Sequence, residues 1–379
     1  MKIEQTSWTV ATGWSPSATG GLEGADLVLV FAGGEAINQE AFLQDIHASY
    51  PAALVFGCST AGEILDTNVR DDSASITAVQ FEGTTLDYAG IDISQAGDSF
   101  DAGKRLADSI PHDGLVHVFV LSDGIHVNGS EVVRGLAHRL PATVGVTGGL
   151  AGDGDRFQET TVIHGMEKTS GHIGLLGLYG PHIRIGYASL GGWDSFGPER
   201  LITRSEGNIL YELDGKSALD LYKTYLGEHA AGLPATGLLF PLSLRTDDGT
   251  PVVRTILGVD EAGQSMTFAG DMPEGAYARL MKANFDRLVD GASDAAQTCL
   301  DAVGDASPDL AILVSCVGRK MVLKQRIEEE VEAVRDVLGD KAVLAGFYSY
   351  GEISPFTPNA RCELHNQTMT ITTLSERAA

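Results

Sequence analysis

Small hydroxyl and thiol side chains stand beside glycines at several places where an apolar run of the sequence ends. Cys58-Ser59-Thr60 follows one such run, and Gly149 and Ser315-Cys316 follow others. In open parallel sheets, ligands bind beyond the carboxyl ends of the strands, where glycine lets the backbone approach a ligand. We therefore predict a polar cleft at one edge of a shared sheet. Its expected lining residues are Cys58, Ser59, Thr60, Ser122, Gly149, Ser315, Cys316 and Tyr348.

Two arginines could bind the carboxylate of a ligand in this cleft. Arg254 lies inside the apolar run 252–256, and Arg319 follows Ser315-Cys316. An arginine among apolar residues needs a partner. With 51 acidic residues in the chain, an internal carboxylate is the favoured alternative partner. The glycines have an alternative role as well, in tight turns and close packing.

Ser59 or Cys58 could instead be the nucleophile of a hydrolase. A nucleophile elbow requires G-x-S-x-G on a turn from a strand into a helix. Here the second glycine, Gly62, comes one residue late, and residues 66–72 are predicted to form a loop that leads into a strand. The apolar neighbours of Cys58 indicate a buried, inert thiol. The hydrolase therefore stays an alternative hypothesis.

Three carboxylates follow the glycine-rich turns: Glu63, Asp153 and Glu352. They could bind an ammonium group or a metal ion, but such acids more often accept hydrogen bonds from turn amides. The ten histidines show no zinc-binding spacing, although one in an apolar pocket could ligate haem iron. No P-loop motif is present, and residues 148–154 do not match the dinucleotide-binding pattern.

A weak threefold repeat supplies the elements that position these residues. Each copy has an apolar strand, a helix and a second strand that ends in a glycine turn, which is typical of a βαβ unit. Phe31 to Gly62 and Leu121 to Gly152 both span 31 positions, and Val314 to Gly351 spans 37. Chance similarity among glycine-rich turns is the alternative explanation. The strand, helix and strand of the copies are 27–31, 38–50 and 53–56; 116–121, 130–140 and 143–146; and 310–314, 323–338 and 342–345.

Between the second and third copies the hydrophobic pattern changes to a period of two. Residues 208–213 meet Asp214-Gly215, which indicates a hairpin, and residues 252–258 and 265–269 indicate another. We predict a boundary near residue 215 between two closely packed modules, residues 25–215 and 216–376. The expected fold class is α/β, with a mostly parallel sheet built from repeated βαβ units and with antiparallel additions.

Composition excludes several classes of protein. The chain has 379 residues, and its 26 basic against 51 acidic residues give a net charge of −25. Such a surface repels phosphate backbones and anionic lipid, so neither a nucleic acid nor a membrane is an expected partner. We find no apolar run long enough to cross a bilayer and no secretory signal, and the four cysteines are far apart. A cytoplasmic location is expected.

The chain resembles the FIST sensory-domain family over most of its length. The most specific motifs lie in the second half, where Val314-Ser315-Cys316-Val317-Gly318-Arg319, residues 346–353 and Leu364-His365-Asn366-Gln367-Thr368 resemble the C-terminal module. Six segments of the first part of the chain resemble the N-terminal module: residues 27–31, 55–63, 121–124, 148–154, 191–193 and 212–215.

This resemblance implies a non-catalytic small-ligand sensor in bacterial-type signal transduction. Amino acids or similar metabolites are the ligands it implies, and some members of the family are haem proteins that sense nitric oxide and regulate a histidine kinase. Haem is therefore a possible cofactor, although no family motif identifies the residue that would ligate its iron. The two modules together occupy the chain, so we expect it to signal by contact with a separate partner protein such as a histidine kinase.

Overall fold

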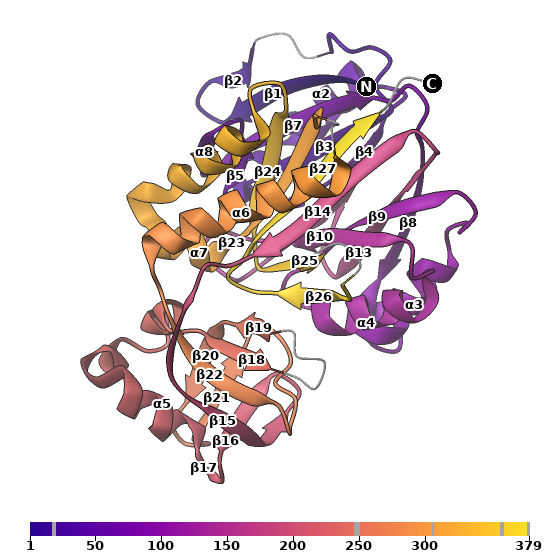
Figure 1. Cartoon of the computed structure of the whole chain (residues 1–379). Helices are drawn as coiled ribbons and strands as arrows, with labels where there is room; N and C mark the ends of the chain where they lie inside the picture. Colours follow the sequence, from indigo (N-terminus) through magenta and orange to yellow (C-terminus); the bar gives the residue numbers. More distant parts are fainter. Residues whose placement is uncertain (17–19, 246–250, 305–306, 357–359, 377–379) are drawn as a thin grey trace.

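Three sheets form one body of the molecule and a fourth sheet forms a second unit (Figure 1). The computed structural model describes residues 1–16, 20–245, 251–304, 307–356 and 360–376. The second unit, residues 194–282, is called the fourth-sheet unit below, and the rest is called the three-sheet body. No helix in these residues has the length and hydropathy needed to span a membrane.

The first sheet has the strand order β12-β11-β4-β3-β7-β1-β2. Its strands are β1 (Lys2–Thr9), β2 (Gly13–Ser15), β3 (Leu27–Ala32), β4 (Leu54–Ser59), β7 (Ser73–Gln80), β11 (Val162–His164) and β12 (Glu167–Thr169). The second sheet has the order β26-β25-β10-β9-β13-β8. Its strands are β8 (Thr85–Asp92), β9 (Leu115–Ser122), β10 (Gly145–Leu150), β13 (His172–Tyr179), β25 (Gly351–Pro355) and β26 (Cys362–His365).

The third sheet has the order β14-β27-β23-β24-β5-β6. Its strands are β5 (Glu63–Leu65), β6 (Asn68–Arg70), β14 (Ile183–Leu190), β23 (Leu310–Cys316), β24 (Val343–Ser349) and β27 (Met369–Glu376). The fourth sheet has the order β19-β18-β22-β15-β16-β21-β20, with β17 paired to β16. Its strands are β15 (Asp194–Glu206), β16 (Ile209–Leu213), β17 (Lys216–Ser217), β18 (Leu242–Arg245), β19 (Pro251–Arg254), β20 (Ile256–Asp260), β21 (Ser265–Phe268) and β22 (Tyr277–Lys282).

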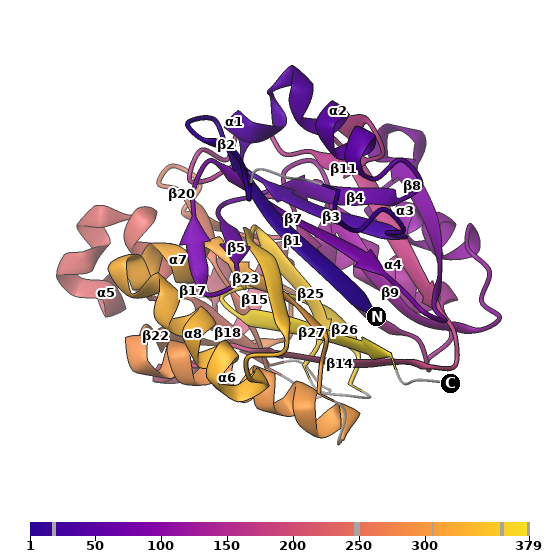
Figure 2. The same cartoon turned by 90° about the horizontal axis from the view of Figure 1, so that it is seen from above.

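Helices cover the outer faces of the three-sheet body (Figure 2). In the first sheet, Phe42 and Ile46 of α2 pack against Val28 and Val30 of β3. α3 and α4 cover the second sheet, and α6 and α8 cover the third. The helices are α1 (Gly34–Ile37), α2 (Glu40–Ser49), α3 (Ser99–Asp108), α4 (Gly129–Arg139), α5 (Ala218–Leu226), α6 (Phe285–Val303), α7 (Val317–Leu323) and α8 (Ile327–Leu338), with short 3-10 turns at η1 (Ile93–Gln95), η2 (Gly227–Gly232), η3 (Ala235–Leu239) and η4 (Lys324–Arg326).

The three predicted βαβ units are present, one in each sheet of the three-sheet body. β3–α2–β4, β9–α4–β10 and β23–α8–β24 each end in a parallel strand pair. An antiparallel strand, β7, β13 or β27, then pairs with the first strand of each unit. The α/β class is confirmed. The mostly parallel sheet is not confirmed, because each unit supplies a single parallel pair and the other strand pairs of the described residues are antiparallel.

The repeats exchange hairpins around the three-sheet body. The hairpin after the first repeat, β5–β6, joins the third sheet through β24. The hairpin after the second, β11–β12, joins the first sheet through β4. The hairpin after the third, β25–β26, joins the second sheet through β10. Each repeat therefore completes the sheet of another, and the three form one cooperative unit.

The second strand of each repeat carries a glycine where it lies very close to the neighbouring parallel strand. Gly57, Gly148 and Gly346 occupy equivalent positions in β4, β10 and β24. A Cβ atom built on any of them would overlap a carbonyl oxygen of the neighbouring parallel strand, for example that of Val30. Any side chain would therefore force the two strands apart.

The inner faces of the three sheets meet in a shared apolar core. Leu29, Phe119 and Ile312 from β3, β9 and β23 belong to one buried cluster, and Phe347 of β24 stacks on Phe31 at a ring-centroid distance of 4.7 Å. The space left along this core is about 10 Å³. Side chains therefore fill the space between the three sheets, because alternate residues of every inner strand are large and apolar.

The fourth-sheet unit is inserted into the third repeat, between β14 and α6. Both hairpins predicted in this region are present: β16 turns into β17 at Asp214 and Gly215, and β20 pairs with β21. The fourth sheet includes strands on both sides of the predicted boundary at residue 215. β22 belongs to the fourth sheet, and β14 forms the edge of the third sheet beside β27.

Candidate functional site

The three glycine-rich turns meet at one end of the three-sheet body. Three backbone hydrogen bonds link them in a ring: Ala61 N to Tyr348 O at 2.8 Å, Gly152 N to Ser59 O at 2.9 Å, and Tyr350 N to Leu150 O at 3.3 Å. The three turns lie together, as the sequence predicted, but they are hydrogen-bonded directly to one another. Space for a ligand is therefore found outside the ring.

Three pockets lie around this ring, one at each junction between repeats. Each is lined by the turn of one repeat and by the segment that follows the first strand of another. The charged pocket, about 510 Å³, lies between the Gly62 turn and α7. The hydroxyl pocket, about 890 Å³, lies between residues 153–161 and α1. The aromatic pocket, about 350 Å³, lies between Tyr350 and residues 124–129.

The charged pocket combines both signs of charge with an apolar patch. Its cations are Arg156, Lys320 and Lys324. Its carboxylates are Glu63, Asp71, Asp72 and Asp155, and its apolar side chains are Val69, Val317, Met321 and Ile327. All three repeats contribute to this lining, so an occupant would contact each of them.

Two cations at this pocket are held by neighbouring groups. The Lys320 ammonium donates to the Ala61 carbonyl at 2.7 Å and pairs with Asp71. Arg156 pairs with Asp153 at 2.6 Å, and this hydrogen bond raises the pKa of the guanidinium. The Arg156 side chain is 44% exposed and lines both the charged and the hydroxyl pockets. Arg156 therefore stays charged at the charged pocket, and the Lys320 ammonium is held between Ala61 and Asp71.

Glu63 forms a buried carboxylate at the base of the charged pocket. Thr60 donates its hydroxyl to one carboxylate oxygen, and Ser73 donates its amide at 2.9 Å and its hydroxyl at 2.6 Å to the other. Burial outweighs these hydrogen bonds and the nearby Lys320, and raises the pKa of Glu63 to about 7. The turn groups therefore satisfy Glu63 internally.

Glu352 repeats this arrangement in the third repeat. It accepts hydrogen bonds from the Ser349 hydroxyl at 2.7 Å and from the Thr368 amide and hydroxyl at 3.2 and 3.0 Å. Burial raises the pKa of Glu352 to about 8. The second repeat lacks a glutamate at this position, since Val162 stands there in the strand register. No cluster of three potential metal ligands occurs among the described residues.

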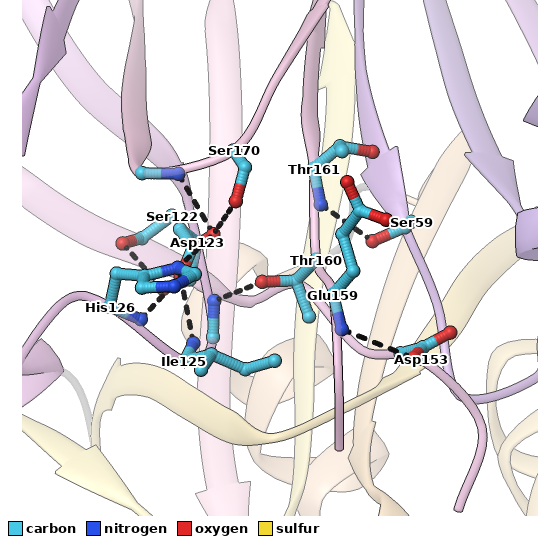
Figure 3. Close-up of polar contacts among 12 residues, drawn as sticks. Ser59, Ser122, Asp123, Ile125, His126, Asp153, Glu159, Thr160, Thr161 and Ser170 are labelled. Carbon is cyan, nitrogen blue, oxygen red and sulfur yellow. Dashed lines mark hydrogen bonds and ion pairs between the residues drawn. The ribbon is translucent and has the colours of Figure 1, made fainter. Parts of the chain in front are cut away.

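The hydroxyl pocket contains Ser59 and lies beside a buried aspartate (Figure 3). The Ser59 hydroxyl accepts a hydrogen bond from the Thr161 amide at 2.9 Å. Asp123 accepts from the amides of Ile125 and His126 and from the Ser170 hydroxyl. Burial would raise the pKa of Asp123, but backbone amide donors outweigh it and the pKa is lowered. Asp123 is therefore a fixed anion beneath the exposed His126 ring.

Of the predicted lining residues, only Ser59 and Thr60 border a junction pocket. Cys58 lies in the central core, and burial raises the pKa of its thiol. Cys316 is also buried, with a raised pKa. A Cβ on Gly149 would meet Val314, so this glycine packs inside the body.

The remaining predicted residues are buried with internal partners. The Ser122 hydroxyl donates to the Asp123 carbonyl at 3.1 Å. Glu330 accepts from the Ser315 hydroxyl at 3.0 Å, from the Tyr348 hydroxyl at 2.6 Å and from the Arg319 guanidinium at 2.6 Å. A single buried carboxylate thus binds three of the predicted ligand-binding side chains.

Arg254 is buried at the contact between the two units. Its guanidinium donates to the carbonyls of Asp271 at 3.2 Å and Leu364 at 2.9 Å, and burial lowers its pKa. Backbone carbonyls therefore take the position that a ligand carboxylate was expected to fill.

Among the charged residues of the charged pocket, Glu63 was predicted as a possible ligand-binding carboxylate, whereas nothing in the sequence indicated the others. Lys320 is the neighbour of Arg319, and Arg156 follows the glycine-rich segment 148–154, but no pattern connects them to Asp71. Only the exchange of hairpins between repeats brings these distant segments together.

The hydrolase alternative requires a base beside its nucleophile. In the part of the chain that the structure describes, no titratable side chain is hydrogen-bonded to the Ser59 hydroxyl, and Cys58 is wholly buried. This geometry does not favour nucleophilic chemistry at either residue.

The haem alternative requires a histidine beside an apolar wall. A pocket of about 610 Å³ next to α4 has this lining, with His138 near Val144 and Val146. The arginines Arg134 and Arg361 also line it, and guanidinium groups pair well with carboxylates such as haem propionates. The residue types therefore fit a haem, with His138 as the candidate ligand.

Models of two domains match the chain. The FIST N domain matches residues 26–216 and the FIST C domain matches residues 218–355. The chain therefore belongs to the FIST family, whose domains are generally small-ligand sensory domains.

One curated relative is an uncharacterized protein of Methanocaldococcus jannaschii, 24% identical over 330 residues. The match covers 80% of this chain, which spans about 60% of the length of that relative. Among solved structures, a cyanuric acid hydrolase aligns with a TM-score of 0.32 and 10% identity over 99% of both chains. The cyanuric acid hydrolase of A. caulinodans aligns with a TM-score of 0.18 and 12% identity over 78% of this chain and 100% of the other. TM-scores this low carry no argument about fold or activity.

Proposed function

We propose that this chain is a non-catalytic sensor of an amino acid or a similar small zwitterion, and that the ligand binds in the charged pocket. The observation that carries the proposal is the lining of that pocket, where cations, carboxylates and an apolar patch surround about 510 Å³. Arg156, Lys320 and Lys324 would bind a ligand carboxylate, and Asp71, Asp72 or Asp155 an ammonium group. The volume lies within the range that small-molecule pockets occupy.

The route from pocket to partner begins at α7. Val317, Lys320 and Met321 of this helix line the charged pocket. Val322 and Leu323 of the same helix pack against Trp193, where the fourth-sheet unit begins. A ligand that contacts α7 can therefore bias the placement of that unit, provided its affinity differs between two placements. A separate signalling protein such as a histidine kinase would detect the difference.

The test is a thermal-shift screen of amino acids and small organic acids, followed by calorimetry on any hit. A true ligand stabilises the folded state, by about 2.7 kcal/mol at a concentration one hundred times Kd. Lys320→Ala should weaken binding at least tenfold. Lys168→Ala is the matched control, because Lys168 lines the hydroxyl pocket instead. Absence of any hit, or equal loss in both variants, would exclude the charged pocket as the sensor site.

Haem binding at the His138 pocket is the second candidate function. Bound haem would supply an iron centre able to bind nitric oxide. Apo-protein titrated with haem should then develop a strong visible absorption band that His138→Ala removes. A wild-type protein that takes up no haem would eliminate this alternative.

A further inference from the structure

The aromatic pocket gathers exposed apolar side chains from both units of the molecule. Ile125 and Phe157 of the three-sheet body are 37% and 42% exposed, and Leu257 of the fourth-sheet unit is 47% exposed. Buried or half-buried side chains make up the rest of the apolar lining: Val127, Leu150, Phe268, Ala269 and Tyr350. Exposed large apolar side chains that cluster in one concave place indicate a binding surface.

Phe157 is held at this pocket in an unusual conformation. Its φ angle is +53°, in the left-handed region that bulky residues rarely adopt. The ring stacks on Tyr350 at a centroid distance of 4.3 Å and an interplanar angle of 16°. The Tyr350 hydroxyl accepts a hydrogen bond from the Phe157 amide at 3.2 Å and donates to the Gly154 carbonyl at 3.3 Å. These contacts fix an aromatic face at the pocket.

The lining of the aromatic pocket contains no Asp, Glu, Lys or Arg, in a chain with a net charge of −25. Its two asparagines already have partners: Asn128 donates to Asp271 at 3.1 Å and Asn208 to the Phe268 carbonyl at 2.8 Å. His126 and Tyr350 are the titratable residues among the lining side chains, and burial raises the pKa of the Tyr350 hydroxyl to about 12, so this group is neutral at neutral pH. A charged ligand would therefore lose its hydration there without gaining an ion pair.

We infer that the aromatic pocket is a second ligand site, separate from the charged pocket, for an uncharged planar molecule of one or two aromatic rings. The Phe157–Tyr350 pair offers a flat ring surface, and aromatic rings prefer such offset stacking. A volume of about 350 Å³ admits a molecule of this size. Because Leu257 and Phe268 line the same pocket from the fourth-sheet unit, the occupant contacts both units.

Indole is the probe for this inference, titrated into the full chain and followed by calorimetry and by methyl NMR of Ile125 and Leu257. Saturable binding is expected, with shifts at both methyl groups. Phe157→Asn removes the ring while asparagine tolerates a positive φ, and should weaken binding about tenfold. Phe285→Asn is the matched control, since Phe285 is 44% exposed on α6 outside the pocket, and it should bind as the wild type does.

Three outcomes would overturn the inference: no saturable binding to the wild type, unchanged binding by Phe157→Asn, or an equal loss in the Phe285 control. Thermal unfolding of each variant verifies that it is folded. The test is independent of the proposed sensor function, because Lys320 lies outside the aromatic pocket and Lys320→Ala, with no ligand in the charged pocket, should leave indole binding unchanged.

Discussion

Replacement of Glu352 by glutamine should reveal a buried acid that holds its proton near neutral pH. The folded-state pKa of about 8 lies above the ordinary value of 4.5, which applies to the unfolded chain. Between these values the folded protein keeps a proton that the unfolded chain has lost. The stability that Glu352 contributes is therefore fully present below pH 4.5 and is lost as the pH rises through about 8.

The size of the effect follows from the two pKa values. One pKa unit corresponds to about 1.4 kcal/mol, and most of the interval between 4.5 and about 8 falls between pH 5.5 and 8.5. Wild-type stability should therefore lose about 3 kcal/mol over this range through Glu352 alone. Glu352→Gln keeps the shape of the side chain and removes its titration. The difference in unfolding free energy between variant and wild type should rise by that amount.

Urea denaturation followed by circular dichroism at several pH values measures this difference. Subtraction of the wild-type curve cancels the titration of every other group. Glu332→Gln, on the exposed surface of α8, is the control and changes no buried group. A difference for Glu352→Gln that stays flat between pH 5.5 and 8.5 would show that the hydrogen bonds from Ser349 and Thr368 already keep the carboxylate ionised. The reasoning from burial would then be refuted.

Other substitutions test the buried interactions directly. Arg319→Met leaves Glu330 as an unpaired buried charge and should cost about 3–5 kcal/mol in urea denaturation; a loss below 1 kcal/mol would show that Glu330 has another partner. Gly148→Ala should cost about 3 kcal/mol or more in the same assay because its Cβ overlaps the neighbouring strand, whereas Gly258→Ala, with no atom near its Cβ, should be close to neutral. Native protein should leave Cys58 unlabelled by a thiol reagent, and rapid labelling at this residue, seen by mass spectrometry, would reopen the nucleophile hypothesis.

The repeating units could be predicted from sequence because each combines two short apolar runs with a helix between them. Leu27 to Phe31 and Val55 to Phe56 show the pattern in the first copy. The exchange of hairpins could not be predicted in this way. Residues 66–72, predicted to form a loop, instead include the strand β6, and nothing in the sequence of residues 63–70 indicates which sheet receives this hairpin. The partner of β5 is β24, whose residues are more than 270 positions away.

The position of the candidate site was predicted more accurately than the residues that line it. The glycine turns do meet at one end of the body, and Ser59 and Thr60 do border pockets. Cys58 and Ser315 were predicted to line the cleft but are buried, because a residue at the end of a buried strand can face either solvent or the core. The direction in which such a side chain faces depends on how the three sheets pack against one another, and no local sequence pattern carries that information.

The internal threefold repeat gives one fold three pockets with different linings. The same junction forms three pockets, and each differs in the segment that follows the first strand of a repeat. α7 brings Lys320 to the first pocket, α1 brings Glu35 to the second, and residues 124–129 bring Ile125 to the third. Only the third is also covered by the fourth-sheet unit, while the first reaches that unit through α7. Occupants of these two pockets would therefore act on one shared element, the placement of the fourth-sheet unit, and their binding should be coupled in both directions.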